Sequence, residues 1–152
     1  LFHGDLVLED SVLADLIRTG SSAVAVDSTL PLPEKDFKAK IQNGNIVAIG
    51  VEFFGEDCIA CQPAYHLTEE AFSRWLAEMR VLIARGETRV YAENALNALD
   101  GALPLAPLEL GGRLCAEIDN PDDLAAVSAR LSQMPGEKFV AIPEATEGRT
   151  NG

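Results

Sequence analysis

Basic side chains are scarce in this 152-residue chain, in which 12 Lys and Arg stand against 24 Asp and Glu and the net charge is −12. A protein that binds nucleic-acid phosphates needs clustered Lys and Arg, and so does one that docks electrostatically on anionic lipid. The composition therefore argues against a nucleic-acid partner and against a membrane partner. The acidity itself has two explanations: solubility alone, or carboxylates that in part hold a metal ion.

Long apolar runs are missing as well. No stretch approaches the roughly 20 residues that a membrane helix needs, and no signal peptide is visible. The chain begins at Leu1, without Met, inside an apolar stretch. We expect a preceding segment, the missing N-terminal half of a longer protein, and any targeting signal would lie in that segment.

Cysteine is limited to Cys58, Cys61 and Cys115. The first two have the Cys-x-x-Cys spacing of some redox and zinc sites. The stretch around them is strand-like, however, and a separation of three on a strand directs two thiols to opposite faces. His3 and His66 are not spaced as partners in a zinc site. We therefore expect reduced, buried thiols in a cytoplasmic protein.

Extended runs alternate with helical patterns along the chain. The apolar run 23–27 is typical of a strand buried on both faces, and Asn43-Gly44 between two extended runs predicts a β-hairpin. Thr68 and Asn120 each precede a helical pattern as N-cap residues, and Trp75 lies on the apolar stripe of the first of these helices. The chain is thus expected to form an α/β domain with an inserted hairpin.

Two acidic motifs lie where strands are expected to end. Gly4-Asp5 follows a short strand, and Glu117-Ile118-Asp119 ends another, with Glu117 and Asp119 on one face of it. Carboxylates at the carboxyl ends of strands are placed to hold a cation. Each motif also has a purely structural explanation: Gly-Asp is a common turn, and residues 119–123 suit the start of a helix.

A third cluster is the polar turn around Tyr91, Glu93, Asn94 and Asn97. It is too polar for a helix whose only role is to pack against the core. A helix face exposed to solvent explains this polarity equally well.

In order along the chain, these motifs resemble the C-terminal part of nucleotidyltransferases built like the sugar-phosphate and phosphocholine nucleotide transferases. Leu1 to Asp10 resembles that family's strand with Gly-Asp, and Glu117 to Leu124 resembles its Glu-Ile-Asp segment. The resemblance implies the C-terminal part of a Rossmann-like domain: a mixed, mostly parallel sheet flanked by helices. We expect this portion to span residues 1–133, with a C-terminal extension over residues 134–152.

The resemblance implies a function as well. Asp5 and Asp119 would be catalytic and would bind Mg²⁺ together with Glu117. Tyr65, Tyr91, Glu93 and Asn94 would bind the substrate, because a cationic head group favours aromatic faces and carboxylates. The reaction would transfer a nucleotidyl group from CTP or another nucleoside triphosphate to a small phosphorylated substrate such as phosphocholine or 2-aminoethylphosphonate. A second copy of this chain, in a homo-oligomer, is a further candidate partner.

Two alternatives stay open. A sugar-1-phosphate nucleotidyltransferase would use the same metal chemistry and would need amides that bind hydroxyls, for which Gln62, Asn94 and Asn97 are candidates. A non-catalytic module that binds a ligand or a partner is the other. It gains support because nothing in this chain resembles the family's Gly-rich loop, which cradles the triphosphate.

Overall fold

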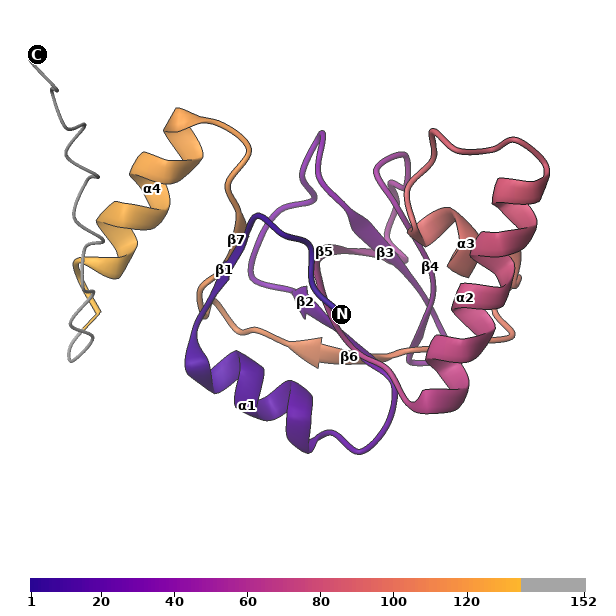
Figure 1. Ribbon diagram of the computed structural model, residues 1–152. Helices are drawn as coiled ribbons and strands as arrows, with labels where there is room; N and C mark the ends of the chain where they lie inside the picture. The colour runs from indigo at the N-terminus through magenta and orange to yellow at the C-terminus, as the bar shows by residue number, and fades with distance from the viewer. Residues whose placement is uncertain (135–152) are drawn as a thin grey trace, which may run out of the picture.

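The computed structural model describes residues 1–134, and in it a five-stranded sheet lies between helices (Figure 1). The strand order is β4-β3-β5-β2-β6, and a separate two-stranded sheet pairs β1 with β7. The strands are β1 (Leu6–Leu8), β2 (Ala23–Asp27), β3 (Lys38–Gln42), β4 (Asn45–Gly50), β5 (Cys58–His66), β6 (Ala106–Glu109) and β7 (Cys115–Glu117). The helices are α1 (Asp10–Arg18), α2 (Glu69–Ala84), α3 (Glu93–Ala98) and α4 (Pro121–Leu131). Apart from Met134, the expected extension 134–152 lies outside the described residues.

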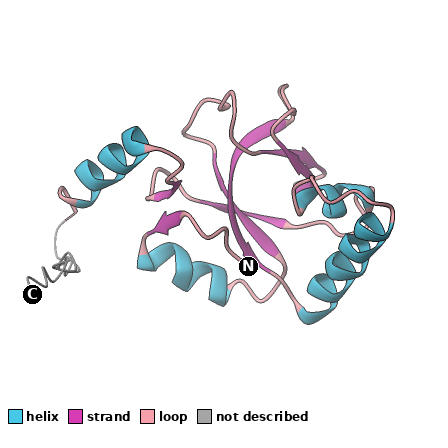
Figure 2. Ribbon diagram, turned by 45° about the horizontal axis from the view of Figure 1, so that its top comes forward, coloured by secondary structure: helices cyan, strands magenta, loops and turns pink. Residues whose placement is uncertain are grey.

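Strand β2 forms the centre of the packing, as its apolar sequence predicts. All five of its residues are buried. Val24 and Val26 pack into the larger core beneath α2 and α3, whereas Ala25 packs with Val12 and Leu16 of α1. This alternation is the period-2 geometry of a strand covered on both faces, and Figure 2 shows the helices on either side of the sheet.

The sheet is mixed, as expected, but the expectation that it is mostly parallel was wrong. Among the described strands of the large sheet, only β2 and β6 pair in parallel. The pairs β2–β5, β3–β5 and β3–β4 are antiparallel. Parallel neighbours require a crossover connection, whereas short links join β3, β4 and β5 directly. The predicted Asn43-Gly44 hairpin is one of these links, and both of its turn residues have positive φ angles of 52° and 78°.

Strand β5 is interrupted by a change of register at its proline. Val24 lies opposite Tyr65 and Ala25 opposite Gln62, so Pro63 and Ala64 stand between paired positions. Proline has no N–H to contribute to a ladder and is found in sheets at edges and irregularities of this kind.

The other edge of β5 is shared by two segments that are distant in sequence. Strand β3 pairs with its first residues, and the Cys61 N–H donates to the Phe37 carbonyl at 3.1 Å. Further along, the His3 N–H donates to the Pro63 carbonyl at 3.2 Å, and the Tyr65 N–H donates to the Leu1 carbonyl at 2.9 Å. The gap between the two segments therefore lies opposite Gln62.

The small sheet brings the two acidic motifs together. β1 and β7 are antiparallel, with Leu6 opposite Glu117, and the Ile118 N–H donates to the Asp5 carbonyl at 2.9 Å. Asn120 then caps α4 with the capping box that its sequence predicts, accepting from the N–H groups of Asp122 and Asp123. None of the helices within residues 1–134 combines the length and apolarity required to cross a membrane.

Asn97 of α3 holds the edge strand β4. Its side chain accepts from the Ile49 N–H at 2.9 Å and donates to the Ile49 carbonyl at 2.8 Å. Asn97→Ala leaves both buried backbone groups without this partner, so we expect the free energy of unfolding to fall by about 2 kcal/mol. Urea denaturation measures the change.

Asn94→Ala is the matched control, because Asn94 lies on the same helix, is exposed and makes no side-chain hydrogen bond within the described part of the chain. Its effect should stay within about 0.5 kcal/mol. Equal effects for the two variants would contradict the role of Asn97.

Candidate functional site

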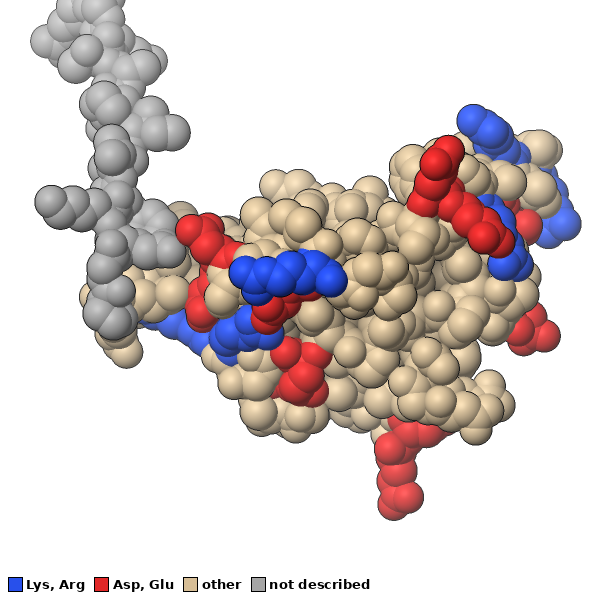
Figure 3. Space-filling view, turned by 90° about the horizontal axis from the view of Figure 1, so that it is seen from below, with Lys and Arg blue, Asp and Glu red and all other residues tan. Residues whose placement is uncertain are grey.

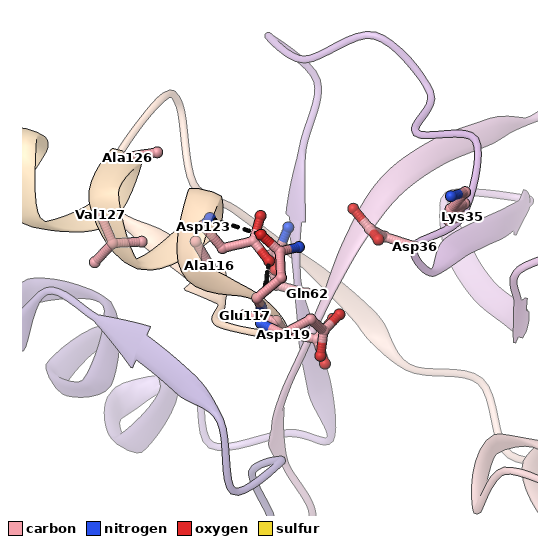
Figure 4. A pocket seen from close by; sticks show the side chains of 10 residues that line it. Lys35, Asp36, Gln62, Ala116, Glu117, Asp119, Asp123, Ala126 and Val127 are labelled. Atoms are coloured by element: carbon pink, nitrogen blue, oxygen red, sulfur yellow. Dashed lines mark hydrogen bonds between the residues drawn. The ribbon is translucent and has the colours of Figure 1, made fainter.

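A cavity of about 170 Å³ lies between the N-terminal segment and the loop before β3, the two segments that share the edge of β5. Its lining comes from the N-terminal segment, the loop before β3, the turn before α3 and the end of β7: His3, Asp5, Lys35, Asp36, Phe37, Val51, Tyr91, Glu117 and Asp119. An adjoining cavity of about 500 Å³ shares Lys35, Asp36, Glu117 and Asp119 and adds Gln62 and the start of α4. Figure 4 shows Glu117 and Asp119 on one side of this second cavity and Asp36 across from them.

Carboxylates from both predicted acidic motifs reach the smaller cavity. Asp5 and Asp119 are exposed, whereas Glu117 is partly buried between them. One ligand-type atom each from His3, Asp5 and Glu117 lies within 4.8 Å of the others. Asp119 lines the same cavity without belonging to this tight cluster. The β1–β7 pairing is the structural cause of the convergence.

His3 connects this cluster to a buried carboxylate. Its Nδ1 lies 3.2 Å from Glu117 Oε1, and its Nε2 lies 3.3 Å from Glu93 Oε1. Glu93 is 1% exposed and also accepts from the Tyr65 hydroxyl at 2.7 Å. Its second oxygen, Oε2, is buried and has no hydrogen-bond partner among the described residues.

Aromatic packing fixes this network in place. Phe37 makes edge-to-face contacts with His3 and with Tyr91, at centroid distances of 5.6 and 5.0 Å. Behind it, Tyr65 packs edge-to-face on Trp75, whose indole N–H donates to the Ala92 carbonyl at 2.7 Å. Trp75 is therefore a core residue, as its stripe position predicted, and it supports both the tyrosine that binds Glu93 and the residue that precedes Glu93.

The electrostatics of the site reflect its crowding of negative charge. Burial raises the pKa of Glu117, the charges of Asp5 and Asp119 raise it further, and the contact with His3 opposes these effects. Burial also raises the pKa of Tyr65 well above its ordinary value, so its hydroxyl stays protonated and donates to Glu93. On the face seen in Figure 3, Lys and Arg side chains lie beside Asp and Glu and do not gather into a basic patch.

The four residues expected to bind substrate differ in position. Tyr91 is half-exposed and lines the cavity. Glu93 and Tyr65 lie behind it, joined to each other, and Glu93 reaches the cavity through His3. Asn94 is exposed on α3. Among the amides proposed to bind hydroxyls, Gln62 lines the larger cavity. The Asn97 amide already forms hydrogen bonds with the backbone of Ile49.

Sequence analysis missed His3, Lys35, Asp36 and Phe37. A signal for His3 was present, because His3 and Asp5 alternate about Gly4 and so face the same side of an extended segment. The loop residues before β3 carry no such pattern. Their position depends on the pairing of β3 with β5, which is a long-range contact.

The prediction of buried, reduced cysteines is confirmed for two of the three. All three are free, and Cys61 and Cys115 are buried, whereas Cys58 is only half-buried. Burial raises the pKa of Cys61 well above its ordinary value and that of Cys115 to about 12. Both buried thiols therefore stay protonated at neutral pH, which disfavours nucleophilic or metal-binding roles.

The raised pKa of Glu117 predicts a pH-dependent effect of Glu117→Gln. Because the folded protein binds this proton more tightly than the unfolded chain, ionised Glu117 lowers stability as pH rises through its folded pKa. The variant should be more stable than the parent at pH 8, and this advantage should shrink as pH falls below the ordinary Glu pKa, where the carboxyl is protonated in both the folded and the unfolded state. Thermal unfolding with a chelator present measures it, and an advantage that does not change with pH would contradict the explanation.

Comparisons with known proteins support the fold. No protein-family model matches the sequence, and no curated protein matches it significantly. Several solved structures resemble it. Among them are the inositol-1-phosphate CTP transferase from T. maritima, at 20% identity over 86% of this chain with a TM-score of 0.57, and a putative glucose-1-phosphate thymidylyltransferase from Bacillus anthracis, at 20% identity over 90% of this chain with a TM-score of 0.62. The match covers 53% and 55% of those chains, so this chain spans about half their length. Residues 1–134 thus have an α/β fold, a mixed sheet flanked by helices, like that of about half of a nucleotidyltransferase.

Proposed function

We propose that this protein transfers a nucleotidyl group from CTP, or another nucleoside triphosphate, to a small phosphorylated or phosphonate alcohol or amine, with release of pyrophosphate. One observation carries the proposal: Asp5, Glu117 and Asp119, from segments more than 100 residues apart, line a single cavity at the edge of the sheet. The likeness in fold to two nucleotidyltransferases supports it.

The donor set of the cavity fits Mg²⁺. Carboxylate oxygens are the protein ligands that Mg²⁺ prefers. Asp5 presents one immediately before β1, and Asp119 presents one just after β7. These two residues would hold the ion, with Glu117 beside them. When bound, the ion supplies charge neutralisation to the phosphate oxygens. The acceptor's phosphate or phosphonate oxygen attacks the α-phosphorus in line, and the role of the protein is to position it.

The aromatic lining favours an acceptor with a cationic head group, such as phosphocholine or 2-aminoethylphosphonate. Tyr91 and Phe37 line the cavity together with its carboxylates, and aromatic faces and carboxylates both attract an ammonium group. Lys35 is the one Lys or Arg among the lining residues, and it would counter the charge of the acceptor's phosphate.

A sugar 1-phosphate is the second candidate for the acceptor. The Gln62 amide lines the adjoining cavity and would donate to and accept from a hydroxyl group. The two structurally similar proteins, an inositol-1-phosphate transferase and a putative glucose-1-phosphate transferase by their titles, also favour it. A non-catalytic module is the third candidate, and it predicts ligand binding without release of pyrophosphate.

Asp119→Asn tests the proposed metal ligand. The variant keeps the shape of the side chain and loses its charge, so the turnover rate should fall by about 10²–10³-fold even at saturating Mg²⁺. The assay measures pyrophosphate release from CTP by the full-length protein, because this chain spans about half the length of the two similar structures.

Asp122→Asn is the matched control. Asp122 lies in the first turn of α4, three residues after Asp119, is exposed and lines neither cavity of the site, so the rate of the variant should stay within about threefold of the parent rate. Near-normal turnover by Asp119→Asn would remove Asp119 from the metal site.

A panel of acceptors tests the head group. Phosphocholine and 2-aminoethylphosphonate should be used in preference to glucose 1-phosphate. Tyr91→Leu should raise the KM for phosphocholine by about 5–30-fold, the loss of one cation–π contact of about 1–2 kcal/mol, whereas Tyr91→Phe keeps the ring and most of the affinity. Preference for glucose 1-phosphate, with a KM that does not respond to Tyr91→Leu, would favour the sugar-phosphate alternative.

A further inference from the structure

His3, Asp5 and Glu117 form a cluster whose chemistry differs from that of a site made of carboxylates alone. One ligand-type atom from each lies within 4.8 Å of the others. Ligand atoms around a first-row ion at bond lengths of about 2.0–2.2 Å lie about 3–4 Å from one another, so small side-chain movements bring these three atoms around one ion. The cluster combines an imidazole nitrogen with two carboxylate oxygens.

The hydrogen bonds of His3 direct one of its nitrogens toward the cluster. Both ring nitrogens contact carboxylates, Nε2 with Glu93 Oε1 at 3.3 Å and Nδ1 with Glu117 Oε1 at 3.2 Å. An ionised carboxylate only accepts hydrogen bonds, so without a cation both contacts are satisfied only when both nitrogens carry a proton. A cation at Nδ1 takes the place of one of these protons, while the N–H at Nε2 still donates to Glu93. A cation between Nδ1 and the two carboxylates satisfies this arrangement.

Glu93 has the position of an outer carboxylate behind a metal-binding histidine. Histidine ligands usually donate their second N–H to a carboxylate or carbonyl, which fixes the tautomer and the ring orientation. Here Glu93 is 1% exposed and is held by the Tyr65 hydroxyl at 2.7 Å. Its Oε2 has no hydrogen-bond partner in the described part of the chain. A buried and incompletely paired carboxylate is costly unless positive charge lies nearby.

We propose that His3, Asp5 and Glu117 bind a divalent first-row transition-metal ion, with Mn²⁺ and Zn²⁺ as its test species, and that Glu93 and Tyr65 position His3 for this role. Imidazole suits Zn²⁺, whereas Mg²⁺ prefers oxygen ligands alone. Mn²⁺, which suits the carboxylates of the cluster, serves as the paramagnetic probe. The inference deepens the proposed function and rests on it for the use of the site in catalysis, but binding of the ion requires no nucleotide.

Electron paramagnetic resonance of Mn²⁺ tests the site in the natural full-length polypeptide without nucleotide. Loss of the free-ion signal measures binding. We expect one Mn²⁺ per chain to bind at His3. Zn²⁺ should displace this ion readily, and Mg²⁺ should displace it only weakly. Electron spin-echo modulation should show coupling to an imidazole nitrogen. This coupling distinguishes a histidine ligand from carboxylates alone.

Three variants distinguish the role of His3 as a ligand from the role of Glu93 as its positioning residue. His3→Gln should abolish the nitrogen coupling and weaken Mn²⁺ binding, whereas His66→Gln, the matched change at the other histidine, should alter neither. Glu93→Gln should keep the coupling and weaken binding by about 10–100-fold, as expected for an outer-shell partner. Circular dichroism verifies that each variant is folded, and the coupling in the parent remains decisive if His3→Gln does not fold.

The outcomes separate the two proposals. Mn²⁺ bound without nitrogen coupling, or absence of Mn²⁺ binding, overturns the His3 site even if Mg²⁺-dependent pyrophosphate release is normal. Nitrogen-coupled Mn²⁺ without any nucleotidyl transfer leaves the His3 site intact and refutes the proposed function.

Discussion

The shared edge of β5 is the constraint on which the rest of the site depends. Strand β3 occupies the first part of that edge, residues 1–3 occupy the last part, and Gln62 lies between their contacts with Cys61 and Pro63. Each segment leaves the edge where the other begins, and Gln62, between them, lines the larger of the two cavities of the site. The two segments also bring their side chains together, because His3 and Phe37 end up in ring contact at this junction. Ligand sites in open α/β sheets commonly lie where neighbouring segments diverge.

The buried carboxylate of Glu93 gives this junction its chemistry. Glu93 is 1% exposed, and a carboxylate so buried is destabilising unless donors or a cation compensate its charge. Tyr65 and His3 supply two contacts, and Trp75 holds both Tyr65 and the turn that precedes Glu93. The core beneath α2 is therefore connected to the cavity by direct side-chain contacts. A change in this core would move Glu93 and, through it, the ring of His3.

The sequence predicted the local features well because their causes are local. The Asn43-Gly44 turn, the Asn120 cap and the burial of β2 follow from residues that are adjacent in the chain, and the structure has all three. Strand direction was wrong because no residue of a strand encodes which neighbour it will pair with. The meeting of Asp5 with Glu117 and Asp119 at one cavity followed from a family resemblance, whereas its physical cause, the β1–β7 pairing, is a long-range contact.

Residues that looked alike in sequence have separate tasks in the fold. Glu93, Asn94 and Asn97 form one polar turn in the sequence, and that turn suggested a single substrate-binding face. In the structure Glu93 points inward to His3, Asn94 is exposed, and Asn97 holds the backbone of β4. The turn is therefore polar for two structural reasons, the contact of Glu93 with His3 and the contact of Asn97 with the β4 backbone. Of these two, only Glu93 is connected to the cavity. Because a short helix directs successive side chains to different sides, composition alone does not separate these tasks, and only the contacts of each side chain show which of them acts on the site.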